Sequence, residues 1–580
     1  MLCRVVMPVF CLRGILREVC PLRTEQMEPL TKKQGMMKKL FVICSWALLL
    51  GGCKSESGAS DPDGDKPVPP PSAELLQKIE DLNAGLVSLK TLAGAVSQSE
   101  VRSLAETEDG VRLTFCDGTE VTVACNAAAE APLIGIAVDG DAYYWTLAAE
   151  KDIPWLKDAA GAKMPVSGPV PVVGRDDKGF WTVTTDAAVT PWQIEDGSGN
   201  PVEATGDEQV ELFRSVKAGN GRVEIALTDG GTLSAAQVND LSVAGTANCY
   251  VVSAPGTYVF NARVRGNGAG EGVGFEPAIE MADGMTADWL WTDSEGLVSG
   301  VALDTTSGDI FLTVGEGRGN ALVALMQDGK VVWSWHVWVT DAPQTMTYGN
   351  GTVFMDRNLG AVGTTAGGTD AYGMYYQWGR KDPFYGGEKT ETSANAFLEA
   401  KNGTVVNPAY PALDWAFSKS ATTTDGAAAN PMTFYNDKVG TGYNWLASPN
   451  ATLWGEAKTL NDPCPPGYRV PETGAWEDLI SGRQYIDGVS VWDGTNYGMT
   501  YTHEEQTAWY PAQGYRNYSS GAIVGLRSST GGSGAYWSAE TSSVKSYYLF
   551  FRSKLSSSGS INNELDMNRS YGYTVRCCKE

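Results

Sequence analysis

Histidine is the residue type that this chain most lacks. Its 580 residues include only two histidines, His336 and His503. A Ser-His-Asp triad or a histidine-rich zinc site would have to use one or both of them, which restricts both kinds of site. His336 lies in residues 331–339, an apolar run that predicts a strand, and we expect a structural role for it.

Basic residues and cysteines are also scarce. The chain has 44 lysines and arginines against 68 aspartates and glutamates, which gives a net charge of -24. An acidic surface repels nucleic acid and anionic lipid headgroups, so we expect no nucleic-acid partner. The cysteines after residue 53 are Cys116, Cys125, Cys249, Cys464, Cys577 and Cys578. They are too few for a disulfide-based scaffold, although one or two bridges fit a location outside the cytoplasm.

Long apolar runs are missing after the N-terminal region, so the sequence predicts no transmembrane helix in residues 54–580. One short apolar run, residues 40–50, follows Lys38 and Lys39 and precedes two glycines and Cys53. A basic segment, a short apolar segment and small residues before a cysteine are typical of a bacterial lipoprotein signal. We therefore expect Cys53 to carry lipid such as palmitate. The lipid would anchor the protein in the outer membrane, exposed at the cell surface.

The residues before this signal do not fit it. Residues 1–35 have no apolar segment directly ahead of a cleavage site, which favours a start at Met36 or Met37. We assign residues 1–52 to the signal region. Residues 53–72 are polar and rich in proline, and they predict a lipidated tether with no core of its own.

An amphipathic helix is predicted over residues 73–97. Its apolar positions alternate spacings of four and three residues, at Leu75, Ile79, Leu82, Leu86, Leu89, Ala93 and Val96. Ser72 is suited to cap the first turn. This heptad pattern favours a short coiled coil, and hence self-association through residues 73–97. The alternative is a single helix packed on the following domain, because Gly85 and Gly94 weaken a free-standing helix.

Residues 111–123 predict a β-hairpin with a three-residue loop. This loop places Gly118 at positive φ and pairs Leu113 with Val121, so that all apolar residues share one face. The same pattern returns in residues 223–233. The sequence therefore predicts two similar hairpins in this part of the chain.

Short aromatic strands are predicted between the two hairpins, at residues 143–147 and 179–183. With the hairpins and the preceding helix, they resemble a Bacteroidetes domain of unknown function, the DUF4988 type. The resemblance covers residues 73–238 and implies a surface module without an assigned activity. Its tryptophans are candidates for stacking on sugar rings, with core packing as the alternative, at Trp145, Trp155, Trp181 and Trp192.

Residues 240–342 predict a small Ig-like β-sandwich, because short alternating apolar runs recur between glycine-rich turns. Residues 247–258 and 333–340 resemble modules that precede the C-terminal domain type described next. In secreted Bacteroidetes proteins, some of these modules accompany pilus-like or adhesive assemblies.

The C-terminal part carries five ordered motifs, at residues 354–361, 372–380, 462–471, 536–538 and 573–577. They resemble the Fibrobacter succinogenes major paralogous domain. The segment around Trp476 also resembles the formylglycine-generating and C-type-lectin-like superfamily. The resemblance implies that residues 345–580 form an α+β domain with short helices around irregular sheets.

The cysteines of this domain suggest one bridge. Alternation in the last strand points Val575 and Cys577 inward, whereas Cys578 points to the other side. We therefore predict a disulfide between Cys464 and Cys577, with Cys578 left free. The alternative is that the buried cysteines serve only as small apolar residues.

We predict no catalytic residue, metal site or cofactor in this domain. The tripeptides that bind calcium in C-type lectins are missing from the sequence, and His503 is the only histidine here. Glu504 and Glu505 form a carboxylate pair that could serve acid–base chemistry, but we expect them to be solvated. Asp356 and Arg357 fit a buried structural pair at least as well as they fit a functional site.

Aromatic residues are the candidates for ligand binding, because a carbohydrate or a peptide can stack on them. The candidates are Tyr375, Tyr376, Trp378, Trp445, Tyr515 and Trp537. Core packing is the alternative for each.

Taken together, these patterns predict a mostly β, multidomain chain. We expect a non-catalytic, lipid-anchored display or adhesion protein that binds a glycan or a surface protein, or that belongs to a pilus. The alternatives are a polysaccharide-acting enzyme with an unrecognised carboxylate site, and a purely structural stalk.

Overall fold

The computed structural model describes residues 70–580 except 126–132, 148–154, 159, 186–188, 197, 206–211, 220, 268–277, 387–403, 527–531 and 554–559. The signal region, Cys53 and most of the tether lie outside the described residues. Strands predominate in the described part, as predicted. None of its helices is long and apolar enough to cross a membrane.

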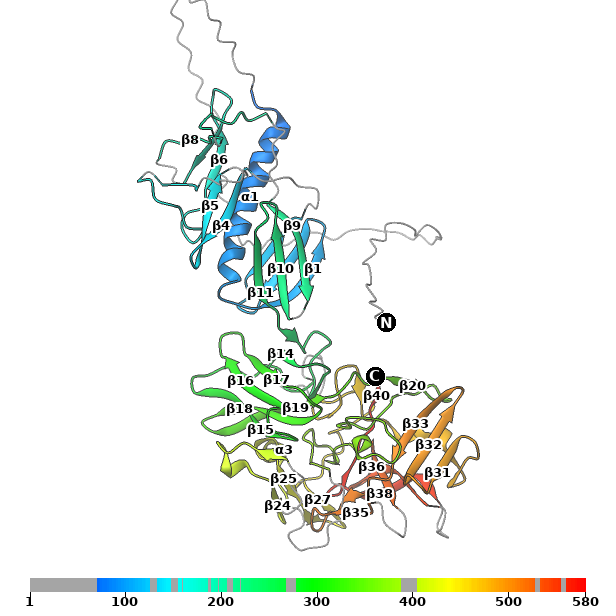
Figure 1. Cartoon of the computed structure of the whole chain (residues 1–580). Coiled ribbons are helices and arrows are strands. Elements are labelled where there is room, and N and C mark those ends of the chain that lie inside the picture. Colours follow the sequence, from blue (N-terminus) through cyan, green and yellow to red (C-terminus); the bar gives the residue numbers. More distant parts are fainter. Residues whose placement is uncertain are drawn as a thin grey trace, which may run out of the picture. The chain divides into compact units, whose positions relative to one another are not determined.

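The N-terminal module pairs one long helix with several small sheets (Figure 1). Its elements are α1 (Ala73–Ala95), β1 (Val101–Thr107), β2 (Gly110–Phe115), β3 (Glu120–Val123), β4 (Ile134–Asp139), β5 (Ala142–Leu147), β6 (Val172–Arg175), β7 (Trp181–Thr184), β8 (Trp192–Gln193), β9 (Phe213–Gly219), β10 (Arg222–Leu227) and β11 (Thr232–Ala236). The predicted hairpin register is confirmed, because Leu113 pairs with Val121 in β2–β3 and Ile225 with Leu233 in β10–β11.

Five of the seven heptad residues predicted for the helix α1 are buried inside this module, and Ile79 and Val96 are partly buried against its core. Ser72 accepts a hydrogen bond from the backbone N–H of Leu75 and so caps the helix. Leu82 and Leu86 are fully buried in a core cluster formed with the module's strands. The structure agrees with the alternative interpretation, a single helix packed on the following domain. The strands of the module cover most of the apolar stripe of α1.

A β-sandwich follows. One sheet has the order β12-β14-β17-β16 and the other β13-β19-β18-β15-β23. The bounds are β12 (Asn239–Asp240), β13 (Cys249–Val252), β14 (Gly256–Asn261), β15 (Met285–Thr292), β16 (Val298–Asp304), β17 (Asp309–Val314), β18 (Gly319–Gln327), β19 (Lys330–Val339) and β23 (Val405–Val406). The edge strand β23 comes from the C-terminal part and pairs with the end of β15.

The larger sheet of the sandwich is buried on both faces. Along β18, Val323 and Leu325 face the sandwich core, whereas Ala324 and Met326 face the core of the C-terminal part. Strands covered on both sides read as nearly continuous apolar runs, which is what β18 and β19 show. The sandwich and residues 345–580 therefore share a core.

The C-terminal part consists of short strands with few helices. Its strands are β20 (Thr345–Thr347), β21 (Val353–Met355), β22 (Tyr376–Gln377), β24 (Ala416–Ser418), β25 (Thr433–Tyr435), β26 (Asp437–Val439), β27 (Gly442–Asn444), β28 (Tyr468–Arg469), β29 (Ile480–Ser481), β30 (Gln484–Tyr485), β31 (Ser490–Asp493), β32 (Gly498–His503), β33 (Gln506–Pro511), β34 (Tyr515–Arg516), β35 (Ile523–Val524), β36 (Ser533–Ser542), β37 (Lys545–Arg552), β38 (Ile561–Asn568), β39 (Gly572–Tyr573) and β40 (Cys578–Lys579). The helices in the described residues of this part are η1 (Thr369–Ala371), η2 (Pro411–Leu413), α3 (Thr424–Ala429) and η3 (Thr473–Leu479).

The sheet β20-β21-β40-β28 separates two apolar cores. Met355 and Cys577 belong to the core shared with the sandwich, whereas their neighbours Phe354 and Cys578 belong to a second core. This is the alternation of Cys577 and Cys578 that the sequence predicts, since successive side chains of a strand point to opposite faces.

Candidate functional site

Five of the six predicted ligand-binding aromatics are buried. Tyr375, Tyr376, Trp378 and Trp537 have no exposed surface, and Trp445 is 1% exposed. They form part of the shared core, and none can offer a ring face to a ligand. The indole N–H of Trp537 donates to the carbonyl of Tyr376, and that of Trp445 to the carbonyl of Trp378. Their prediction as binding residues is therefore wrong, because packing and backbone hydrogen bonds already occupy them.

Two tryptophans of the N-terminal module, Trp145 and Trp181, are also fully buried. Trp155 and Trp192 are partly buried. The ammonium group of Lys163 lies 4.1 Å from the centre of the Trp155 ring and covers it. Core packing thus accounts for the first two, and Lys163 occupies one face of the third.

Tyr515 is the exception among the predicted aromatics, because its side chain remains partly exposed. It belongs to a set of four partly exposed rings in mutual contact, here called the tyrosine cluster: Tyr443, Tyr515, Tyr518 and Tyr571. The ring centres of Tyr443 and Tyr518 are 4.6 Å apart, and those of Tyr518 and Tyr571 are 4.9 Å apart. The Tyr515 and Tyr571 centres are separated by 5.7 Å.

Three separate pieces of chain deliver these rings. Tyr443 lies in the β26–β27 hairpin, Tyr515 and Tyr518 in the β34–β35 hairpin, and Tyr571 between β38 and β39. Figure 1 places the labelled strands β27, β35 and β38 in the same region of the C-terminal part. Contacts between rings so distant in sequence arise only through the tertiary fold.

Buried groups hold the tyrosine cluster from below. Tyr573 lies 5.5 Å from Tyr571 and stacks at 4.3 Å on the buried Trp537, measured between ring centres. The buried guanidinium of Arg516 donates to the carbonyls of Gly521 and Tyr385 and so fixes the β34–β35 hairpin. The cluster is therefore built on a rigid support.

Tyrosine neighbours and burial dominate the electrostatics of this cluster. Burial, together with the neighbouring Tyr515 and Tyr518, raises the pKa of Tyr571 to about 12. Burial alone raises the pKa of Tyr515. The hydroxyl groups of Tyr515 and Tyr571 are thus neutral over the physiological pH range. Within the described residues, the four hydroxyls make no hydrogen bond to protein, which leaves them available to a ligand.

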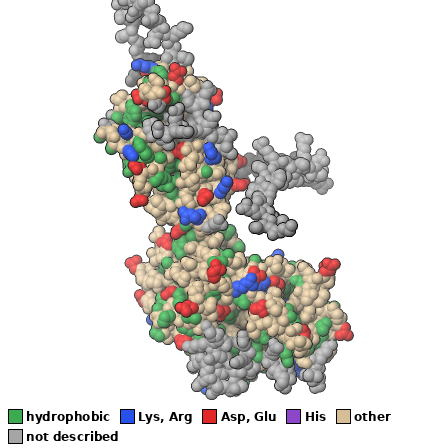
Figure 2. Space-filling view, in the orientation of Figure 1, with side chains coloured by type: hydrophobic (Ala, Val, Ile, Leu, Met, Phe, Trp, Pro, Cys, Tyr) green, Lys and Arg blue, Asp and Glu red, His purple; other side chains and the backbone are tan. Residues whose placement is uncertain are grey.

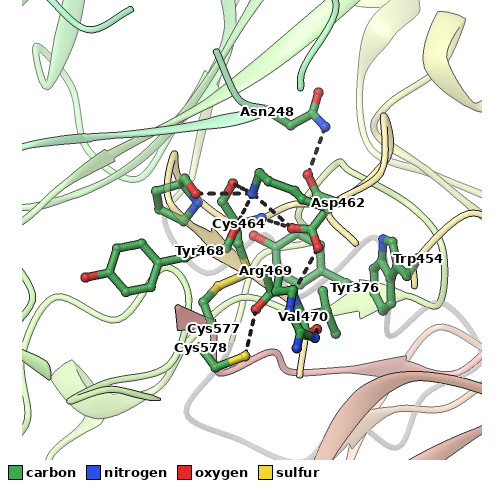
Figure 3. The surroundings of a disulfide bond; sticks show 12 residues. Asn248, Tyr376, Trp454, Asp462, Cys464, Tyr468, Arg469, Val470, Cys577 and Cys578 are labelled. Carbon is green, nitrogen blue, oxygen red and sulfur yellow. Dashed lines mark hydrogen bonds and ion pairs between the residues drawn. A yellow bond between two sulfur atoms is a disulfide. The ribbon is translucent and has the colours of Figure 1, made fainter. Parts of the chain in front are cut away.

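The predicted cysteine pair is joined in the structure (Figure 3). Cys464 and Cys577 form a disulfide with their Cα atoms 6.0 Å apart. Cys578 is free and buried, and its thiol lies 3.7 Å from the carbonyl of Arg469. Burial raises the pKa of this thiol to about 11, so it is unreactive at neutral pH.

Polar groups brace the loop that carries Cys464. The buried carboxylate of Asp462 accepts hydrogen bonds from the backbone N–H groups of Cys464 and Val470 (Figure 3). The ammonium group of Lys458 lies 3.3 Å from Asp462 and also donates to the carbonyls of Cys464 and Tyr468. The side chains of Asp462 and Lys458 thus satisfy backbone N–H and C=O groups that have no partner in a helix or sheet.

A chain of polar groups, buried except for the partly exposed Asp293, connects the sandwich to the C-terminal part. The side-chain N–H of Asn320 donates to Asp293 at 2.8 Å, so its oxygen is free to accept from His336 Nε2, also at 2.8 Å. His336 Nδ1 then faces the hydroxyl of Tyr376 at 3.4 Å. Burial lowers the pKa of His336 to about 3, which keeps the ring neutral. His336 thus has the structural role that the sequence predicts.

The carboxylates that the sequence analysis considered for acid–base chemistry do not belong to this series of hydrogen-bonded polar groups. Glu504 and Glu505 are exposed in a turn, as expected of solvated groups. Arg357 is 4% exposed in its side chain and bridges Asp356 at 2.8 Å and Asp341 at 3.0 Å. The Asp356–Arg357 pair therefore serves packing.

Sequence reasoning missed Tyr443, Tyr518 and Tyr571. Tyr518 follows Tyr515 by three residues, and this local spacing was an available signal. No pattern in the sequence links Tyr443 to residues more than 70 positions away.

The comparison with known families agrees with the reading of the N-terminal part. No curated protein matches the chain. Residues 72–238 match the family model of DUF4988, a domain of unknown function. This range begins at the helix-capping residue Ser72 and ends directly after β11. This match supports the resemblance to the DUF4988 type that the sequence indicates for residues 73–238.

Proposed function

We propose that this protein is a lipid-anchored display and adhesion protein of the bacterial outer membrane, and that it has no catalytic role. The lipoprotein signal ending at Cys53 supports the anchor. The resemblance of residues 345–580 to a C-type-lectin-like domain of secreted proteins supports a binding role for that part. Basic and acidic side chains are interspersed on the face drawn in Figure 2, as suits a solvated exterior.

One observation carries the non-catalytic part of this proposal: buried ionisable groups of the described residues serve packing. Arg569 donates to the carbonyls of Asn450 and Ser543, and Arg576 donates to the carbonyl of Trp509. His336 is enclosed within the chain of polar groups described above. Catalytic groups instead combine a displaced pKa with access to a cleft.

A labelling experiment tests the anchor and its location. Cells producing the full chain are grown with an alkyne analogue of palmitate, and the purified protein is examined for the label. We expect Cys53→Ser to abolish labelling and Cys44→Ser, a matched change in the apolar run, to leave it intact. Protease treatment of intact cells should then remove the labelled protein's C-terminal part. Unlabelled wild-type protein, or full protection from protease, would refute the proposal.

A further inference from the structure

We propose that the tyrosine cluster binds an uncharged carbohydrate by stacking against sugar rings, without a metal ion. This inference rests on the proposed adhesive function and names its ligand class. The cluster combines four partly exposed rings in one continuous contact, at Tyr443, Tyr515, Tyr518 and Tyr571.

The chemistry of the rings fits a sugar. A pyranose has an apolar C–H face and a rim of hydroxyl groups, and tyrosine has an apolar ring and one hydroxyl. Tyr518 contacts both Tyr443 and Tyr571, with interplanar angles of 42° and 58°, so the rings present faces in several directions. Rings that face different directions can each stack on a different sugar unit. Tyrosine also loses little conformational entropy on binding, since it has only two side-chain torsions.

The rigid support strengthens the inference. The Tyr515–Tyr518 segment is fixed by Arg516, and the turn after it is closed by a hydrogen bond from the backbone N–H of Gly521 to the carbonyl of Asn517. Tyr571 rests on Tyr573, which is 2% exposed. A pre-ordered surface pays less entropy on binding than one that must first assemble.

The surroundings favour an uncharged ligand over an anionic one. The pKa of Tyr571 is raised by burial and by the neighbouring tyrosines, and no charged side chain contributes to this shift. Of the two cations beside the cluster in strand register, Lys438 pairs with Tyr443 across the β26–β27 hairpin, whereas the guanidinium of Arg516 is buried and donates to backbone carbonyls. The net charge of the chain, -24, opposes polyanions.

The surroundings also disfavour an apolar peptide as the ligand. Large aliphatic side chains that are well exposed are concentrated in residues 70–243. In the described residues of the C-terminal part, they are limited to Val491 and Leu565. A peptide groove would need several such residues beside the rings.

Equilibrium binding to the full chain, purified in detergent, tests the inference. The probes are neutral cello-, xylo-, manno- and malto-oligosaccharides, and an oligogalacturonate serves as the anionic probe. We expect at least one neutral probe to bind in the presence of EDTA. Tyr518→Ala and Tyr443→Ala should each weaken this binding about tenfold or more. Tyr518→Phe, which keeps the ring, should stay within about threefold of wild type.

Two control variants make the result specific. Tyr547 is a partly exposed tyrosine on β37 whose neighbour Tyr548 faces the buried rings, so Tyr547→Ala changes a tyrosine on the opposite face. Both Tyr547→Ala and Lys438→Gln should bind like wild type. Near-UV circular dichroism checks that each variant is folded.

Three outcomes would overturn the inference. These are binding of none of the probes, neutral binding that survives both alanine changes, and binding restricted to oligogalacturonate and lost in Lys438→Gln. None of them bears on the palmitate labelling or the protease result, so a wrong ligand class is distinguishable from a wrong location.

Discussion

The polar chain Asp293–Asn320–His336–Tyr376 predicts a specific dependence of stability on pH. Its hydrogen bonds require a neutral His336, because Asn320 offers its oxygen to Nε2 and Nδ1 must accept from Tyr376. The pKa of His336 is lowered from 6.5 to about 3 by burial. The pKa of Asp293 is raised from 3.8 to about 6, again by burial, against the hydrogen bonds from Asn320.

The two shifts have opposite signs. Between pH 6.5 and 3 the unfolded chain holds a proton on His336 that the folded chain does not, so acidification destabilises the fold. Between pH 6 and 3.8 the folded chain protonates Asp293 first, so acidification stabilises it, and this contribution is lost as pH rises through 6. On going from pH 7 to pH 5, the histidine lowers the free energy of unfolding by about 2 kcal/mol. The aspartate contributes a gain of at most about 1 kcal/mol, since Asp293 is partly exposed.

Variants separate the two contributions. Urea unfolding of wild type, His336→Gln and Asp293→Asn is followed by tryptophan fluorescence at pH 7 and pH 5. We compare the change in the free energy of unfolding from pH 7 to pH 5 with the change in wild type. This change should be about 2 kcal/mol more favourable to the fold in His336→Gln and about 1 kcal/mol less favourable in Asp293→Asn. Because other titrating groups are common to all three proteins, they cancel in the differences. An identical pH response of His336→Gln and wild type would refute the account of a buried neutral histidine.

Three further predictions concern packing and crosslinking. Leu82→Ala should cost about 2–5 kcal/mol in unfolding of the N-terminal module, whereas Leu76→Ala, at a position 48% exposed, should cost under about 1 kcal/mol. Sedimentation showing that Leu82→Ala dissociates an oligomer of folded chains would contradict the packing of α1. Cys464→Ser should lower stability by about 4–5 kcal/mol, since the bridge closes a sequence separation of 113 residues. Unchanged thermal unfolding would speak against a bridge to Cys577. Lys458→Met should cost about 3–5 kcal/mol by leaving a buried carboxylate unpaired, which calorimetry can check.

Local patterns suffice for much of the fold. Alternating apolar residues predict both hairpins, because a slip of one residue would expose Leu113 or Ile225. The same alternation in the last strand separates Cys577 from Cys578 and so identifies the bridged cysteine. These features depend on neighbours in sequence, which is why they could be predicted.

Features that depend on distant contacts could not be predicted in this way. The heptad of α1 describes an apolar stripe equally well whether a second helix or a sheet covers it. In β18, burial on both faces depends on the C-terminal part packing against the sandwich. Likewise, aromatic residue type alone does not distinguish the buried Trp378 from the partly exposed Tyr518.

A single measurement tests most directly the claim of binding without catalysis. Cells displaying the full chain are incubated with the neutral oligosaccharide probes, and the sugars, both free and eluted from the cells, are analysed by chromatography. The account predicts that cells with the wild-type chain retain a probe and release it at its original length, and that cells with Tyr518→Ala retain about tenfold less. Shortened sugars that depend on the wild-type chain, or equal retention by both kinds of cell, would contradict it.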